Sequence, residues 1–207
     1  MAAALAWDTY TEIDIVPKRL LVTAATVAFM AAAHGESFEF NQAGTLTVDA
    51  GATRSATLHL ACSPDSDGGA LSIELQVPEA YTRKDFDYDD FEGPDAAAAD
   101  KALSHVAWTS AAGTTDIRHV AAGWYAADPP DAFLFGISQP SHHRKPPASL
   151  IAAIGPAAGQ LVWTQAGFDK PARRLVATFQ FDAAAAARLH GAVVRCLPIN
   201  SPMNPGR

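Results

Sequence analysis

The chain has 207 residues, of which 49% are hydrophobic, and its formal net charge is −7 at pH 7. This length allows one domain or two small ones, and the apolar share is sufficient for a packed core. The acidic balance argues against non-specific nucleic-acid binding, which depends on basic patches that displace phosphate counterions. It also gives no reason to expect attraction to anionic membranes.

The N-terminal region has the features of a secretory signal peptide. Lys18 and Arg19 precede an apolar run over residues 20–33, and small residues follow the run. These are the three parts of such a signal, and the run is short for a permanent span across about 30 Å of hydrocarbon. Together with the alanine-rich composition, they predict a periplasmic or secreted bacterial protein, cleaved after Gly35 or Ala33, with no stable membrane insertion afterwards. A buried core helix or an N-terminal anchor is the alternative.

Two runs of alternating hydrophobic residues, 54–62 and 70–77, are separated by turn-forming residues. Alternation with period two is typical of half-buried strands, so the pair predicts a β-hairpin. Matching the two apolar faces puts His59 opposite Glu74 or Ser72 on the outer face. Similar alternation predicts further strands around 38–40 and 46–48, and over 105–110, 117–127, 132–138, 160–165 and 173–181.

Short helices are expected over 94–106, over 148–156 and after Asp182. Asp182 is a good N-cap before an alanine run. In this last helix the apolar residues fall on one stripe, which should dock on the sheet; they are Leu189, Ala192, Val193 and Cys196.

Residues 36–197 are therefore interpreted as a single mainly β (α+β) domain, with 1–35 as N-terminal extension and signal peptide and 198–207 as a disordered tail. The expected architecture is an antiparallel β-sandwich-like or curved sheet with one to three short helices, of which the C-terminal one packs on the sheet.

The only two cysteines are Cys62 and Cys196. An oxidising compartment would let them pair, and both fall on faces expected to point into the core. We predict a disulfide between them, which would close a loop of more than one hundred residues; two unrelated buried thiols are the alternative.

The most charged stretch is "DFDYDDFEGPD", residues 85–95. It fails as an EF-hand loop, because Asp90 stands where glycine is required and Ala96 where the bidentate glutamate is required. Its aromatic and acidic residues alternate, so we expect the rings to point inward and the carboxylates outward. Such a loop also suits a partner surface. The candidate binding residues are Phe86, Asp87, Tyr88, Asp89, Asp90, Phe91 and Glu92.

No local motif identifies a catalytic residue, a metal ligand or a cofactor site. The histidines of the mature chain are dispersed: His59, His105, His119, His142, His143 and His190. A second aromatic group is most simply core packing, although it also suits a ligand-binding face; it comprises Trp124, Tyr125, Phe133 and Phe135, with Trp108 and Trp163 as extensions. The leading hypothesis is a non-catalytic binding protein whose partner is an unknown protein or envelope component. A hydrolase with a dispersed active site and a metal-binding exported protein remain as alternatives.

Overall fold

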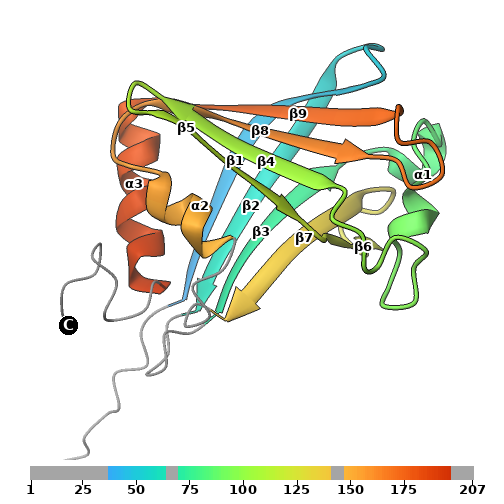
Figure 1. Cartoon of the computed structure of the whole chain (residues 1–207), viewed down its shortest axis with the longest axis horizontal. Helices are drawn as coiled ribbons and strands as arrows, with labels where there is room; N and C mark the ends of the chain where they lie inside the picture. Colours follow the sequence, from blue (N-terminus) through green and yellow to red (C-terminus); the bar gives the residue numbers. More distant parts are fainter. Residues whose placement is uncertain (1–36, 64–69, 141–146, 197–207) are drawn as a thin grey trace, which may run out of the picture. The chain divides into compact units, whose positions relative to one another are not determined.

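The computed structural model describes residues 37–63, 70–140 and 147–196, and in this part of the chain nine strands form one antiparallel sheet (Figure 1). The predicted signal peptide and the predicted C-terminal tail lie outside the described residues. From edge to edge the strands are β5 (Gly113–His119), β4 (Ser104–Ser110), β8 (Gly159–Ala166), β9 (Arg174–Phe181), β1 (Phe38–Val48), β2 (Arg54–Ser63), β3 (Ala70–Val77), β7 (Phe133–Pro140) and β6 (Ala122–Tyr125).

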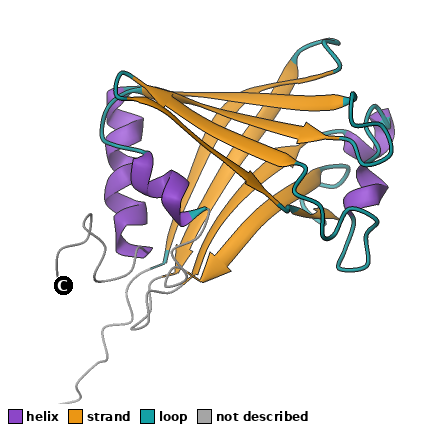
Figure 2. Ribbon diagram, in the orientation of Figure 1, coloured by secondary structure: helices purple, strands orange, loops and turns teal. Residues whose placement is uncertain are grey.

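The sheet is strongly curled, because its two edge strands are consecutive in the chain. Only Val120 and Ala121 separate the end of β5 from the start of β6. A flat nine-stranded sheet would be about 38 Å wide, whereas so short a connection reaches about 11 Å at most. The edges must therefore approach each other at this point, and the sheet bends into a half-barrel (Figure 2).

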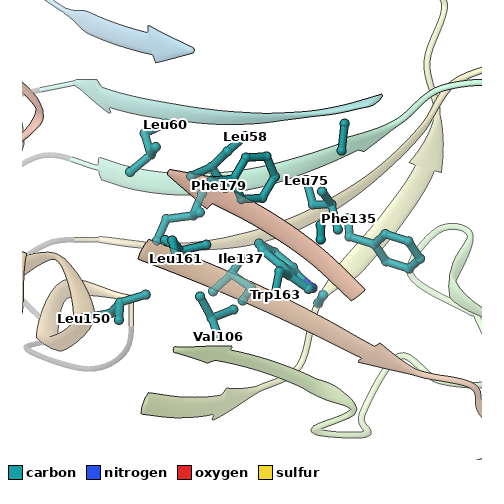
Figure 3. Packing of buried hydrophobic residues seen from close by; sticks show 14 of the residues in the cluster. Leu58, Leu60, Leu75, Val106, Phe135, Ile137, Leu150, Leu161, Trp163 and Phe179 are labelled. Atoms are coloured by element: carbon teal, nitrogen blue, oxygen red, sulfur yellow. The ribbon is translucent and has the colours of Figure 1, made fainter. Parts of the chain in front are cut away.

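The concave face of the sheet holds the core. Alternate residues of each strand point inward, and Figure 3 shows leucine, isoleucine and aromatic side chains from facing strands packed together. The largest fully buried side chains include Trp108, Trp163, Phe133, Phe135, Phe179, Leu58, Leu60, Ile73 and Leu75. The predicted hairpin is confirmed as β2 and β3, with His59 opposite Glu74.

Helices cover the two ends of the curled sheet (Figures 1 and 2). At one end lie α2 (Ala148–Ala153) and α3 (Ala183–Val193), which continues into the 3-10 turn η3 (Val194–Cys196). Asp182 caps α3, accepting a hydrogen bond from the Ala185 N–H at 2.7 Å. The predicted apolar stripe of α3 is buried. At the other end lie α1 (Ala80–Arg83) and the 3-10 helix η1 (Tyr88–Phe91). A mainly β protein with a curved sheet and a docked C-terminal helix is thus confirmed.

Two strand boundaries differ from prediction. The pieces expected around 38–40 and 46–48 form one strand, β1, whose apolar pattern is interrupted at Gly44. A Cβ at Gly44 would collide with the Phe179 ring and the Thr178 carbonyl, so close packing against β9 replaces a side chain there. The run over 117–127 is not one strand, because it divides between β5 and β6 on opposite edges.

The helix predicted over 94–106 is wrong. Turns at 94–95 and 97–100 and irregular backbone over 101–103 replace it, and the remainder belongs to β4. Helical bonding would join the Ala98 N–H to the Pro94 carbonyl, but this N–H donates to the Asp90 carbonyl at 2.9 Å instead. A single short alanine run stabilises a helix too weakly to resist this tertiary contact.

Cys62 and Cys196 form a disulfide, as predicted, with their Cα atoms 5.8 Å apart. It joins β2 to the end of α3, and both residues are buried, with exposed fractions of 1% and 0%. Within the described residues, no helix has the length and apolarity needed to cross a membrane.

Replacing both cysteines by alanine should lower the free energy of unfolding by up to about 5 kcal/mol, because the bridge restricts the unfolded chain over a sequence separation of 134 residues. Guanidinium denaturation measures the change, and reduced wild type should approach the double variant. Detection of two alkylatable thiols in the unreduced, denatured protein would contradict the prediction.

Candidate functional site

Residues 85–95, which we call the acidic segment, close the end of the half-barrel where α1 lies. Their three aromatic side chains point into the core, and Phe86, Tyr88 and Phe91 have exposed fractions of only 3%, 2% and 2%. Their rings pack on Phe133 and Phe135, with centroid distances of 5.2–6.3 Å. The prediction that the rings point inward is confirmed.

The predicted binding residues therefore fall into two groups, one buried and one accessible to solvent. The aromatic members belong to the core and do not reach the surface as anchors for a partner. Asp87, Asp89, Asp90 and Glu92 are exposed or half-buried, so the carboxylates are the part of the set available for binding.

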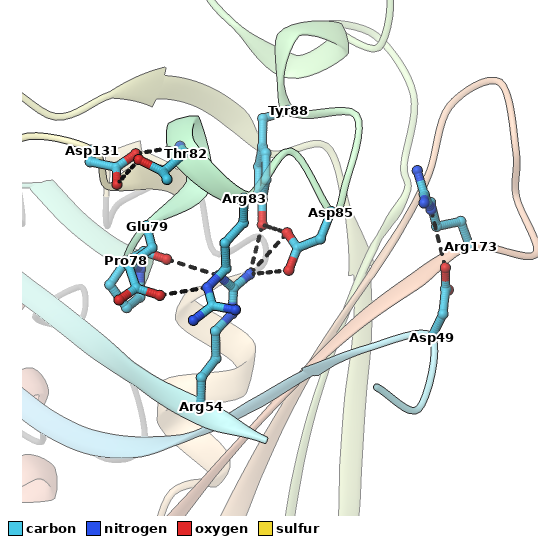
Figure 4. Close-up of polar contacts among 10 residues, drawn as sticks. All are labelled: Asp49, Arg54, Pro78, Glu79, Thr82, Arg83, Asp85, Tyr88, Asp131 and Arg173. Carbon is cyan, nitrogen blue, oxygen red and sulfur yellow. Dashed lines mark hydrogen bonds and ion pairs between the residues drawn. The ribbon is translucent and has the colours of Figure 1, made fainter. Parts of the chain in front are cut away.

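A partly buried arginine holds the acidic segment in place (Figure 4). The Arg54 side chain, 10% exposed, forms an ion pair with Asp85 at 3.0 Å. It also donates hydrogen bonds to the Tyr88 hydroxyl at 3.0 Å and the Pro78 carbonyl at 3.1 Å. The Tyr88 hydroxyl in turn donates to Asp85 at 3.0 Å. Burial raises the pKa of Tyr88, and the neighbouring Asp85 charge adds to the rise, so this phenol remains a donor at neutral pH.

Asp131 fixes the start of α1. Its carboxylate accepts hydrogen bonds from the Thr82 N–H and hydroxyl, both at 2.7 Å, and its backbone carbonyl accepts one from the Ala80 N–H. The hydrogen bond from the Thr82 side chain lowers the pKa of Asp131. With the helix held here, Tyr81 and Lys84 point outward, and Tyr81 is 62% exposed.

A pocket of about 360 Å³ opens between α1, the acidic segment and the β8–β9 turn. We call it the tyrosine pocket; its polar and aromatic lining is Tyr81, Lys84, Phe86, Asp87, Tyr88, Asp89, Asp90, Tyr125, Asp169 and Lys170. The rings of Tyr81 and Tyr125 meet edge to face with centroids 5.8 Å apart. The Lys84 ammonium lies 5.5 Å from the centroid of the Tyr81 ring.

Negative charge predominates in the tyrosine pocket, where four carboxylates oppose two ammonium groups. Partial burial raises the pKa of Asp90, and the nearby charges of Asp169, Asp87 and Asp89 raise it further. Burial also raises the pKa of Tyr125, whose hydroxyl donates to Asp89 at 2.8 Å. The pocket can therefore favour a cation by charge and by the π faces of its rings.

Five of its lining residues were not among the candidates found from the sequence: Ala80, Tyr81, Lys84, Asp169 and Lys170. Ala80 and Tyr81 lie on the one-turn helix α1 and Lys84 caps its C-terminal end, and so short a helix leaves no periodic signal. Asp169 and Lys170 lie in the β8–β9 turn, and its proximity to the acidic segment depends on the curl of the sheet.

The other predicted candidates lie elsewhere. His59 contacts Glu74 at 3.3 Å on the outer face of β2 and β3, and His105 contacts Asp116 at 2.8 Å near the β5 edge. Within 37–63, 70–140 and 147–196, no three His, Cys, Asp or Glu side chains are arranged to hold a metal ion. His142 and His143 lie outside the described residues. In the second aromatic group only Trp124, 38% exposed, and the half-buried Tyr125 reach the surface, while the remaining members are buried.

Replacing Arg54 by methionine should destabilise the protein by about 2–3 kcal/mol, because Asp85 and the Tyr88 hydroxyl lose their charged partner at a site largely shielded from water. Urea denaturation measures this loss. Arg118→Met on the exposed face of β5 is the matched control and should change stability by less than about 0.5 kcal/mol. Equal losses in the two variants would show that Arg54 has no special anchoring role.

Asp90→Asn should raise the melting temperature at neutral pH by about 1–2 °C, because it removes a charge that its surroundings oppose. The pKa of Asp90 is raised in the folded state, so wild type is least favoured above that pKa, where the carboxylate is ionised. The advantage of asparagine should disappear as the pH falls below the ordinary aspartate pKa, where both folded and unfolded wild type are protonated. Thermal melts from pH 3 to 8 test this; an advantage that persists at pH 3 would contradict it.

Comparison of this chain with protein-family models, with curated proteins and with solved structures finds no match. The geometry and charge of its own residues are therefore the basis for a functional proposal.

Proposed function

We propose that the chain is an exported, non-catalytic bacterial binding protein, which holds a cationic group of a protein or envelope partner in the tyrosine pocket. Export is supported by the signal-like sequence of residues 1–35 and by the Cys62–Cys196 disulfide, because such bonds persist in oxidising compartments.

The observation that carries the proposal is the exposed Tyr81 ring beside four carboxylates. A large aromatic side chain that is 62% exposed gains little from its own fold, whereas aromatic residues are enriched where proteins bind partners. Tyr81 does not stand alone, since the ring of Tyr125 supports its edge and α1 is held by Asp131. The ring is thus held ready for a ligand.

Lys84 indicates the chemistry of that ligand. Its ammonium lies over the Tyr81 ring, so the ring already attracts a cation from the chain itself. A lysine or arginine side chain from a partner can displace Lys84 and gain a second interaction with the Asp89 and Asp90 carboxylates, both of which line the pocket. Ring and carboxylates together select a positively charged group rather than a neutral one.

Capture from bacterial envelope extract on the immobilised protein tests this proposal. Tyr81→Ala should reduce the recovered partner about 5–30-fold, which corresponds to ~1–2 kcal/mol for a cation–π contact. Asp89→Asn with Asp90→Asn should also reduce recovery, and raised salt should weaken binding.

Asp95→Asn is the matched control, because Asp95 is an exposed carboxylate of the same segment that does not line the pocket. Quantitative mass spectrometry compares recovery across the variants. A partner recovered equally by wild type, Tyr81→Ala and the double aspartate variant would overturn the assignment of the pocket, and a failure to enrich any component would overturn the binding function.

A further inference from the structure

A second pocket, of about 320 Å³, lies beside the acidic segment and differs from the tyrosine pocket in charge. We call it the arginine pocket, because three guanidinium groups line it, those of Arg54, Arg83 and Arg173. Two carboxylates, Asp49 and Asp85, complete its charged lining. Figure 4 shows Arg54 and Arg83 on one side of Asp85 and Arg173 with Asp49 on the other. Three arginines at one pocket stand out in a chain with a net charge of −7.

The three arginines are held in different ways. Arg54 is committed to Asp85, Tyr88 and the Pro78 carbonyl, so it supplies charge rather than free donors. Arg83 uses its Nε atom to bind Glu79 in an i,i+4 pair. Arg173 uses Nε to bind Asp49 at 3.1 Å, and its Nη1 atom lies 3.6 Å from Asp87.

Arg83 and Arg173 still have N–H groups that can donate hydrogen bonds to a ligand. Among the described residues, the two Nη atoms of Arg83 and the Nη2 atom of Arg173 make no hydrogen bond. Their side chains are 48% and 30% exposed, so a ligand can reach them from solvent. The carboxylates nearby do not take these donors, since Asp85 faces Arg54 and Tyr88, and Asp49 also accepts the Arg174 N–H at 2.7 Å.

We propose that the arginine pocket binds an oxyanion, a carboxylate or phosphate group, between Arg83 and Arg173. The planar fork of a guanidinium pairs with two oxygens of such a group at once. Arg83 can offer its two Nη atoms as such a fork, and the Nη2 atom of Arg173 adds a further donor from the opposite side of the pocket. The carboxylate arises from an acidic side chain or C-terminus of a partner, and the phosphate from a phosphorylated ligand or free phosphate.

Titration of the full mature protein with inorganic phosphate, followed by the NMR resonances of the arginine Nε–H groups, tests the site. Sodium chloride at the same ionic strength is the reference for screening. Wild type should show saturable shifts at Arg83 and Arg173. Arg83→Gln and Arg173→Gln should each weaken the binding about tenfold or more, because each removes a positive charge together with its charge-assisted hydrogen bonds to the anion. Arg118→Gln, at an exposed arginine on β5, should leave it unchanged.

A parallel titration with acetate distinguishes the sources. Saturable binding of both anions identifies a site that accepts a partner's carboxylate, and binding of phosphate alone identifies a phosphate site. Shifts that rise linearly, or saturable shifts that persist in Arg83→Gln and Arg173→Gln, would overturn the proposal. Arg83 is exposed and its removal spares the core, so Arg83→Gln remains decisive even if Arg173→Gln fails to fold. Neither anion titration depends on the partner sought at the tyrosine pocket, so the two proposals fail independently.

Discussion

The connection between β5 and β6 sets the geometry on which the rest of the structure depends. Two residues join the opposite edges of a nine-stranded sheet, so the sheet must curl and its concave face becomes the core. Curling leaves two open ends, through which water would otherwise reach the buried leucine and aromatic side chains. One end is covered by α2 and α3, with the disulfide at Cys196 tying α3 to β2. The acidic segment covers the other end.

A segment that closes this end must present apolar side chains to the core and polar side chains to water within one short stretch. Its aromatic side chains, Phe86, Tyr88 and Phe91, are buried in the core. The carboxylates that alternate with them need contact with water or with a positive charge. Arg54, the first residue of β2, supplies a positive charge at this end of the half-barrel. Its ion pair with Asp85 holds the acidic segment in place. Farther along the segment, partial burial raises the pKa of Asp90, and the neighbouring charges of Asp169, Asp87 and Asp89 raise it further. Because its pKa is raised in the folded state, ionised Asp90 opposes folding rather than supporting it.

Local pattern predicted much of the fold. The alternation in β2 and β3 predicted the inward faces and placed His59 opposite Glu74 or Ser72, of which the structure shows Glu74. The core-facing cysteines predicted the disulfide. The errors concern relations between distant segments. Alternation over 117–127 continues through the point where the chain crosses between sheet edges, and the alanines after Pro94 are held in turns by a contact to Asp90. For the same reason Asp169 could not be placed beside the predicted carboxylates, because only the curl of the sheet brings it there. Tyr81 is close to them in sequence, but it lies on a helix of one turn that leaves no periodic signal.

The tyrosine and arginine pockets meet at Asp87, which lines the first and lies 3.6 Å from Nη1 of Arg173 in the second. In this ion pair the Asp87 carboxylate and the Arg173 guanidinium partly neutralise each other. A cation bound near Asp87 would weaken the hold of Asp87 on Arg173 and leave Arg173 freer to bind an oxyanion. By linkage, an oxyanion on Arg173 must favour the cation to the same extent. If both proposed sites bind their ligands, this coupling would favour a partner that presents positive and negative groups side by side over one that presents either alone.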